Sequence, residues 1–140
     1  MIDTDHIFLD TNILVYAHSK DDEQKFKIVE FLLGEKLRNS RIFVSVQVVN
    51  EFYSVMSKYK MPHSRIKECV KDLSIYINIK SISFNTVKLA FYIKEKYHYS
   101  WWDSLVLASA LENGCKIIYS EDMQHEQVIE NTLEIVNPFI

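Results

Sequence analysis

Residues 6–17 read HIFLDTNILVYA, a short apolar run that ends at an acidic residue and continues as a second apolar stretch. Residues 6–9 have the length of a short buried strand, and the apolar stretch after Asn12 suits a helix. We therefore expect a strand, then Asp10 at its carboxyl end, then a helix that begins near Ile13. The order of apolar run and polar residue recurs further along the chain.

Four other short apolar runs predict strands, and the segments between them have helical periodicity. The strands are RIFV at 41–44, YINIKSI at 76–82, KIIY at 116–119 and LEIV at 133–136. Helices are expected over 25–37, 48–59, 87–93 and 105–111, and a further one should open at Pro62. This alternation predicts a mainly parallel sheet of about five strands with helices on both faces.

The length of 140 residues and the absence of repeats or linkers predict a single domain, 1–140. The apolar runs are too short to cross a membrane, and the N-terminus carries acids where a signal peptide needs positive charge. We therefore expect a cytoplasmic protein without membrane contact. The chain has two glycines, Gly34 and Gly114, which excludes a glycine-rich phosphate loop. Any phosphate must be held by side chains or by metal ions.

The charge is unevenly distributed. Between Lys58 and Lys96 there are nine Lys and Arg against three acids, a net charge of +6, while the rest of the chain carries −9. Such a basic segment is a plausible contact surface for a polyanion. The alternative is a set of solvated helix faces without a partner.

Acidic and small polar residues follow several of the predicted strands. Asp10 and Asn12 follow the first, a helix carrying Glu51 follows the second, and Ser120 to Asp122 follow the fourth. Because the carboxyl ends of parallel strands meet at one edge of a sheet, we expect these groups to gather there. Each has a structural alternative, such as a helix cap for Asp10, a solvated acid for Glu51 and a turn for Asp122.

Asp103 begins an apolar helix after Ser100, so it could belong to a capping box. However, it shares a face with Val106, Leu107 and Ala110, where an unpaired carboxylate would be costly. Crowded carboxylates repel each other unless a cation lies among them. Oxygen ligands favour Mg²⁺ or Mn²⁺, and the sequence lacks the signatures of a covalent nucleophile. These features favour metal-dependent hydrolysis of a phosphodiester.

The segments FLDTNILVYA, VVNEF, YSWWDSLVLASAL and IIYSEDMQ resemble the PIN domain, and among PIN domains the VapC-type toxins of toxin–antitoxin pairs. The resemblance implies a three-layer α/β/α sandwich, Mg²⁺- or Mn²⁺-dependent endoribonuclease activity, a homodimer and inhibition by a cognate antitoxin. By position it gives an acidic quartet that binds the metal and carries the catalysis, Asp10, Glu51, Asp103 and Asp122, supported by Asn12 and Ser120.

This chain departs from the family pattern after Asp122, where a further acid is common and the sequence reads MQHE. Glu121, Asp122 or Glu126 could complete the site, and we favour Asp122. The residues expected to contact RNA are Lys58, Lys60, Arg65 and Lys67. The alternatives are a catalytically silent PIN-like binding module and a stand-alone RNA-processing nuclease. A haloacid-dehalogenase-type phosphatase is disfavoured, because it would need an acid where Asn12 stands.

Overall fold

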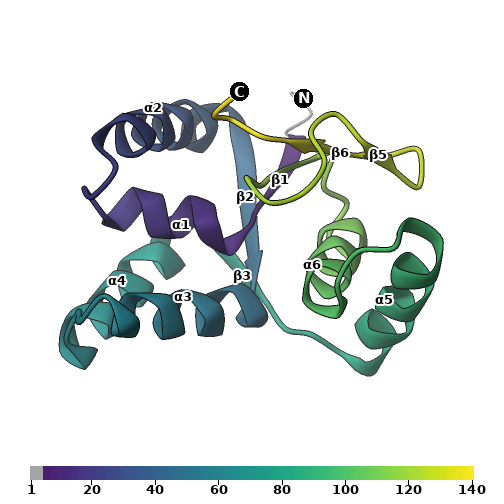
Figure 1. Cartoon of the computed structure of the whole chain (residues 1–140), viewed down its shortest axis with the longest axis horizontal. Helices are drawn as coiled ribbons and strands as arrows, with labels where there is room; N and C mark the ends of the chain where they lie inside the picture. Colours follow the sequence, from purple (N-terminus) through teal and green to yellow (C-terminus); the bar gives the residue numbers. More distant parts are fainter. Residues whose placement is uncertain (1–4) are drawn as a thin grey trace.

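The computed structural model describes residues 5–140, in which helices and strands alternate along most of the chain (Figure 1). In chain order these are β1 (Asp5–Leu9), α1 (Thr11–His18), α2 (Glu23–Asn39), β2 (Ser40–Ser45), α3 (Val46–Lys58), α4 (His63–Tyr76), β3 (Asn78–Lys80), α5 (Phe84–Tyr97), α6 (Trp101–Glu112), β4 (Ile117–Tyr119), β5 (Val128–Ile129) and β6 (Leu133–Val136).

The strands form one sheet in the order β3-β2-β1-β4-β6-β5. All neighbours are parallel except β5 and β6, which pair antiparallel. All five expected strands are present, so the prediction of a mainly parallel sheet is confirmed. The sixth strand, β5, is only two residues long, and it forms because the chain turns back along β6.

Helices cover both faces of the sheet. The helices α1 to α4 lie on one side of the strands, and α5 and α6 lie on the other (Figure 1). The three-layer α/β/α arrangement expected from the family resemblance is therefore confirmed. Every residue of α6 from Ser104 to Ala110 is buried. A helix enclosed on all sides needs apolar or small residues all round, which this segment has.

Two helices begin at a polar residue at the carboxyl end of a strand. Asp10 caps α1 after β1, and the Ser45 hydroxyl caps α3 after β2 by accepting from the Val48 N–H. Pro62 precedes α4, as expected. Among the described residues 5–140, no helix has the length and hydrophobicity of a membrane span.

The enclosed position of α6 predicts a large stability loss on truncation of its core side chains. Leu107 is fully buried, so Leu107→Ala should lower the free energy of unfolding by about 2–5 kcal/mol. Leu37→Ala on α2, where the side chain is 44% exposed, should cost less than about 1 kcal/mol. Urea unfolding of both variants measures the difference. Equal losses would contradict the packing described here.

Candidate active site

Asp10 lies at the carboxyl end of β1 and is only 5% exposed. Its Oδ1 accepts a hydrogen bond from the Thr11 N–H at 2.8 Å, and its Oδ2 accepts one from the Ser120 hydroxyl at 2.8 Å. Ser120 directly follows β4, which is the neighbour of β1 in the sheet. The capping role that the sequence left open is present, and the same carboxylate also joins two strand ends.

The electrostatic environment of Asp10 disfavours its charge. Burial raises the pKa of this carboxyl to about 6, although the hydrogen bonds from Ser120 and Thr11 act in the opposite direction. The negative charges of Asp103 and Glu51 raise the pKa further. A nearby cation would reverse this effect by favouring the carboxylate form.

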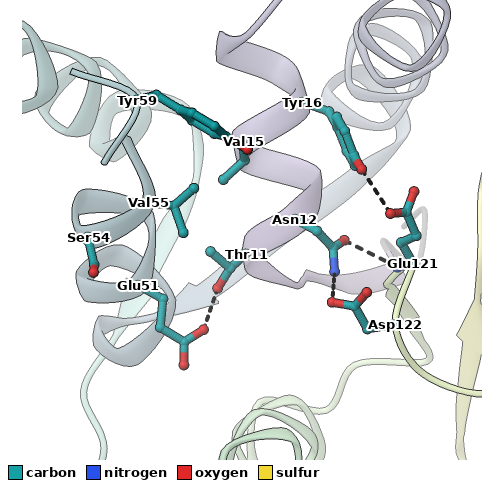
Figure 2. A pocket seen from close by; sticks show the side chains of 10 residues that line it. All are labelled: Thr11, Asn12, Val15, Tyr16, Glu51, Ser54, Val55, Tyr59, Glu121 and Asp122. Atoms are coloured by element: carbon teal, nitrogen blue, oxygen red, sulfur yellow. Dashed lines mark hydrogen bonds between the residues drawn. The ribbon is translucent and has the colours of Figure 1, made fainter. Parts of the chain in front are cut away.

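Glu51 projects from α3 toward the start of α1. Its Oε2 accepts from the Thr11 hydroxyl at 2.7 Å (Figure 2). Its Oε1 accepts from Gln47 Nε2 at 2.8 Å. Gln47 Nε2 also donates to the backbone carbonyl of Trp102 at 3.1 Å. The sequence analysis missed Thr11 and Gln47 as orienting residues. The available signals were the adjacency of Thr11 to Asp10 and the one-turn spacing of Gln47 and Glu51.

Asp103 occupies the first turn of α6, where its backbone N–H donates to the Ser100 hydroxyl at 3.1 Å. The side-chain carboxylate of Asp103 also interacts with Ser100, and this interaction acts to lower its pKa. Burial raises the pKa of that carboxyl, and the negative charges of Asp122 and Glu51 add to the shift. Asp103 therefore interacts with acids that come from α3 and from the loop after β4.

Asp122 lies in the loop after β4, which Asn12 ties to α1. Asn12 Nδ2 donates to Asp122 Oδ2 at 3.0 Å, and Asn12 Oδ1 accepts from the Glu121 N–H at 3.2 Å (Figure 2). The Ser120 hydroxyl also accepts from the Asp122 N–H at 3.3 Å. These contacts place Asn12 and Ser120 between the two loops that carry Asp10 and Asp122.

The other two acids considered for this position have different surroundings. Glu121 accepts from the Tyr16 hydroxyl at 2.8 Å and forms an ion pair with Lys25 at 2.5 Å. Glu126 is exposed and lies 3.4 Å from His125 Nε2. Of the three acids, Asp122 is the one whose negative charge raises the pKa of Asp103.

The chemistry of this group suits a hard divalent cation, because its donors are carboxylate, hydroxyl and amide oxygens. Within residues 5–140, no three His, Cys, Asp or Glu side chains lie close enough together to hold a metal ion as they stand. The pKa values of Asp10 and Asp103 are raised mainly by burial and to a smaller extent by neighbouring negative charges, and a cation would offset both effects. The charge and chemistry of these donors therefore fit Mg²⁺ or Mn²⁺. To bind such an ion, the carboxylates would have to move closer together.

Two hollows border Glu51. One lies between α1 and α3, has a volume of about 490 Å³ and includes Asn12, Glu51 and Asp122 in its lining (Figure 2). The other lies between α3 and the start of α6 and has a volume of about 510 Å³, with Trp102 in its wall. Two of the four predicted acids, Glu51 and Asp122, therefore lie next to open space that a larger molecule could enter.

The four basic residues expected to contact RNA lie on α3, α4 and the turn between them. Lys58 ends α3, Lys60 lies in the turn, and Arg65 and Lys67 belong to α4. All four side chains are exposed. Arg65 lies 3.6 Å from Glu68 in an exposed ion pair, which contributes little to stability. Their contact with RNA stays a prediction.

A sequence model of the PIN domain matches residues 7–131. The chain belongs to the PIN domain family. PIN domains are typically ribonucleases, and they generally use divalent metal ions. The match spans the strand ends that carry Asp10, Ser120 and Asp122 and the helices that carry Glu51 and Asp103.

Solved structures support the fold of this PIN domain. A chain of a toxin–antitoxin complex from Klebsiella pneumoniae is 19% identical to this one. The match covers 94% of this chain and 97% of that chain, with a TM-score of 0.72. VapC20 of Mycobacterium tuberculosis, a toxin that cleaves the sarcin–ricin loop, is 16% identical to this chain. The match covers 80% of this chain and 86% of VapC20, with a TM-score of 0.67.

A chain of VapBC2 of Rickettsia felis, solved with a DNA fragment of its promoter, is 22% identical to this one. The match covers 94% of this chain and 99% of that chain, with a TM-score of 0.65. At these identities, the likeness concerns the fold of the PIN domain. None of the curated proteins matches the sequence closely enough to add to this comparison.

The raised pKa of Asp10 predicts how stability depends on pH in EDTA. The folded-state pKa is about 6 against an ordinary 3.8, so between these values the folded protein keeps a proton that the unfolded chain releases. The free energy of unfolding should therefore fall as the pH rises through this window. In Asp10→Asn, the amide oxygen can accept from the Thr11 N–H and the amide NH₂ can donate to the Ser120 oxygen, so most of this fall should disappear without loss of the contacts.

Urea unfolding between pH 4 and 7, with Asp72→Asn on α4 as the matched control, measures the effect. Part of the slope should remain in Asp10→Asn, because the pKa of Asp103 is raised as well. Parallel curves for wild type and Asp10→Asn would show that Asp10 is not the group responsible.

Proposed function

We propose that this PIN domain, comprising residues 1–140, is a metal-dependent endoribonuclease that hydrolyses RNA phosphodiester bonds as the toxin of a toxin–antitoxin pair. The catalytic and metal-binding residues would be Asp10, Glu51, Asp103 and Asp122. The observation that carries the proposal is the network of contacts at the carboxyl edge of the sheet, where Thr11 hydrogen-bonds to both Asp10 and Glu51, and Ser120 to both Asp10 and the backbone of Asp122. Burial and like charges raise the pKa of Asp10 and of Asp103, which is the environment of a cation site rather than of a surface cluster.

Bound Mg²⁺ or Mn²⁺ would lower the pKa of a water molecule and neutralise charge on the phosphate. The protein's own residues would orient the reactants. Ser120 and Thr11 fix Asp10 by hydrogen bonds, and Thr11 and Gln47 fix Glu51. Glu51 is the acid we assign to orient the attacking water. Hydrolysis in line with the leaving oxygen would give a 5′-phosphate and a 3′-hydroxyl.

The assignment as a toxin is supported by the fold shared with VapC20 and with two toxin–antitoxin complexes. The proposed partners are an RNA substrate, a cognate antitoxin and a second copy of the chain in a homodimer. A short reading frame for a DNA-binding protein beside this gene would support the pairing. A neighbour of another kind would favour a stand-alone RNA-processing nuclease.

The variant Asp103→Asn distinguishes a role of Asp103 as metal ligand from a role in helix capping, because Ser100 caps the helix through the backbone N–H of residue 103, which the variant keeps. Without metal, the variant should be at least as stable as wild type, since one repelling charge is gone. Mn²⁺ at 100 times its Kd should stabilise the wild type by about 2.7 kcal/mol, a rise of several degrees in Tm, and the variant much less. RNA cleavage should fall by more than about 100-fold.

The measurements are thermal melting with and without Mn²⁺, and cleavage of a mixed RNA pool by protein purified free of antitoxin. Asp72→Asn on α4 makes the same chemical change outside the site and should behave like wild type in both assays. If Asp103→Asn cleaves RNA at the wild-type rate, the assigned site is wrong. A Mn²⁺-stabilised wild type that cleaves no RNA would instead indicate a catalytically silent PIN module.

The basic residues of α3 and α4 predict the salt dependence of RNA binding. Each phosphate contact contributes roughly −0.7 to the slope of log K against log salt for a single strand. Replacing Lys58, Lys60, Arg65 and Lys67 together by Gln should therefore reduce the slope by as much as about 3. Fluorescence anisotropy with a labelled single-stranded RNA between 50 and 300 mM salt, a range chosen around physiological ionic strength, measures it. An unchanged slope would assign these charges to the solvated surface.

A further inference from the structure

The groove between α1 and α3 extends well beyond the two proposed catalytic acids that line it, Glu51 and Asp122. At one end it is lined by Asn12, Glu51 and Asp122, and at the other by Tyr59, just past the end of α3 (Figure 2). Its volume of about 490 Å³ falls within the roughly 300–1,000 Å³ of small-ligand sites. The proposed hydrolysis uses only the acidic end, so the remainder of the groove has no assigned role.

The wall of this remaining part is suited to a flat, apolar ring. Val15 of α1 and Val55 of α3 supply aliphatic surface on its two sides (Figure 2). Tyr59 lines the same groove and is 59% exposed. An exposed aromatic ring next to aliphatic side chains offers a stacking surface for a nucleobase, because every base has a π-face.

Positive charge accompanies this surface. Lys58 lies two turns after Glu51 and one turn after Ser54, so helical periodicity places all three on one face of α3. Glu51 and Lys58 are therefore separated by roughly 10 Å along the helix axis. Among the residues that the structure describes, neither Lys58 nor Lys60 forms an ion pair. These ammonium groups remain available to a phosphate near the distal end of the groove.

We propose that the groove between α1 and α3 is a nucleotide subsite that holds one unpaired nucleotide of the RNA strand next to the phosphate at the acids. Its base stacks on Tyr59 between Val15 and Val55, and its distal phosphate contacts Lys58. A base in a duplex is stacked and paired, so it cannot enter without being unpaired first. The subsite thus selects single-stranded RNA. This inference rests on the proposed function.

The second hollow, between α3 and α6, is a weaker candidate for the same role. Of the four proposed catalytic acids, Glu51 lines this hollow, whereas both Glu51 and Asp122 line the groove between α1 and α3. The groove between α1 and α3 runs from these two acids to the ring of Tyr59, and Lys58, the residue before Tyr59 in the chain, adds positive charge at the end of α3. An RNA strand presents phosphates and bases in alternation, which matches this order.

The test compares Tyr59→Ala with Tyr59→Phe, which keeps the ring. Binding of a fluorescent single-stranded oligoribonucleotide is measured by anisotropy in EDTA and again in Ca²⁺. Tyr59→Ala should bind roughly 5- to 100-fold more weakly than wild type, and Tyr59→Phe nearly as well as wild type. Tyr76→Ala, which removes an exposed tyrosine at the end of α4, is the matched control and should bind like wild type.

Two further readouts separate stacking from a merely structural role. In cleavage assays with Mn²⁺, Tyr59→Ala should raise KM much more than it lowers kcat, and wild type should cleave a single-stranded RNA faster than the same sequence within a duplex. Lys58→Gln should reduce the salt slope by about 0.7, while Lys71→Gln on α4 should leave it unchanged.

The outcomes distinguish this inference from the proposed function. Loss of oligonucleotide binding in Tyr59→Ala with no cleavage by wild type would keep the subsite and reject the nuclease. Wild-type cleavage with unchanged binding and KM in Tyr59→Ala would overturn the subsite and leave the nuclease intact, and the groove would then be assigned to a protein partner. Absence of any oligonucleotide binding by wild type would also overturn the subsite.

Discussion

The hydrogen bond between the Ser120 hydroxyl and the buried carboxylate of Asp10 is the interaction on which the candidate site depends. It can form only because β1 and β4 are parallel neighbours that end at the same level, where Leu9 pairs with Tyr119. Through its other oxygen, Asp10 also caps α1, which fixes the positions of Thr11 and Asn12. Thr11 then orients Glu51, and Asn12 holds Asp122. One buried carboxylate thus organises contacts that reach α3 and the loop after β4.

This arrangement has an electrostatic cost that the rest of the fold must offset. Burial, with a smaller contribution from the neighbouring acids, raises the pKa values of Asp10 and Asp103, so in the absence of a cation the site opposes folding at neutral pH. The opposing contribution comes from the sheet and from α6, whose residues 104–110 are all buried. Carboxyl groups with raised pKa values are common at functional sites.

Helix α3 connects the two parts of the molecule to which we assign a function. Its first half carries Gln47 and Glu51 toward the acids, and its last turn carries Lys58 beside Tyr59. Because the helix is rigid, the distance between the acidic end and the basic end is fixed in advance. This geometry would hold an extended strand across the acids without requiring a loop to close.

The sequence by itself determined the order of the elements, the mainly parallel sheet and the strand ends at which the acids gather. It could do so because short apolar runs followed by polar residues are local signals, set by burial and by helix capping. The two-residue strand β5 was not predictable, since two residues carry no periodicity. Only the tertiary structure decided the different surroundings of Glu121 and Asp122. Although they are adjacent in the chain, Glu121 contacts Lys25 on α2 and Asp122 contacts Asn12 on α1. The choice of partner depends on where the helices pack and not on the order of residues. The groove beside Tyr59 likewise exists only because α1 and α3, far apart in the chain, pack side by side.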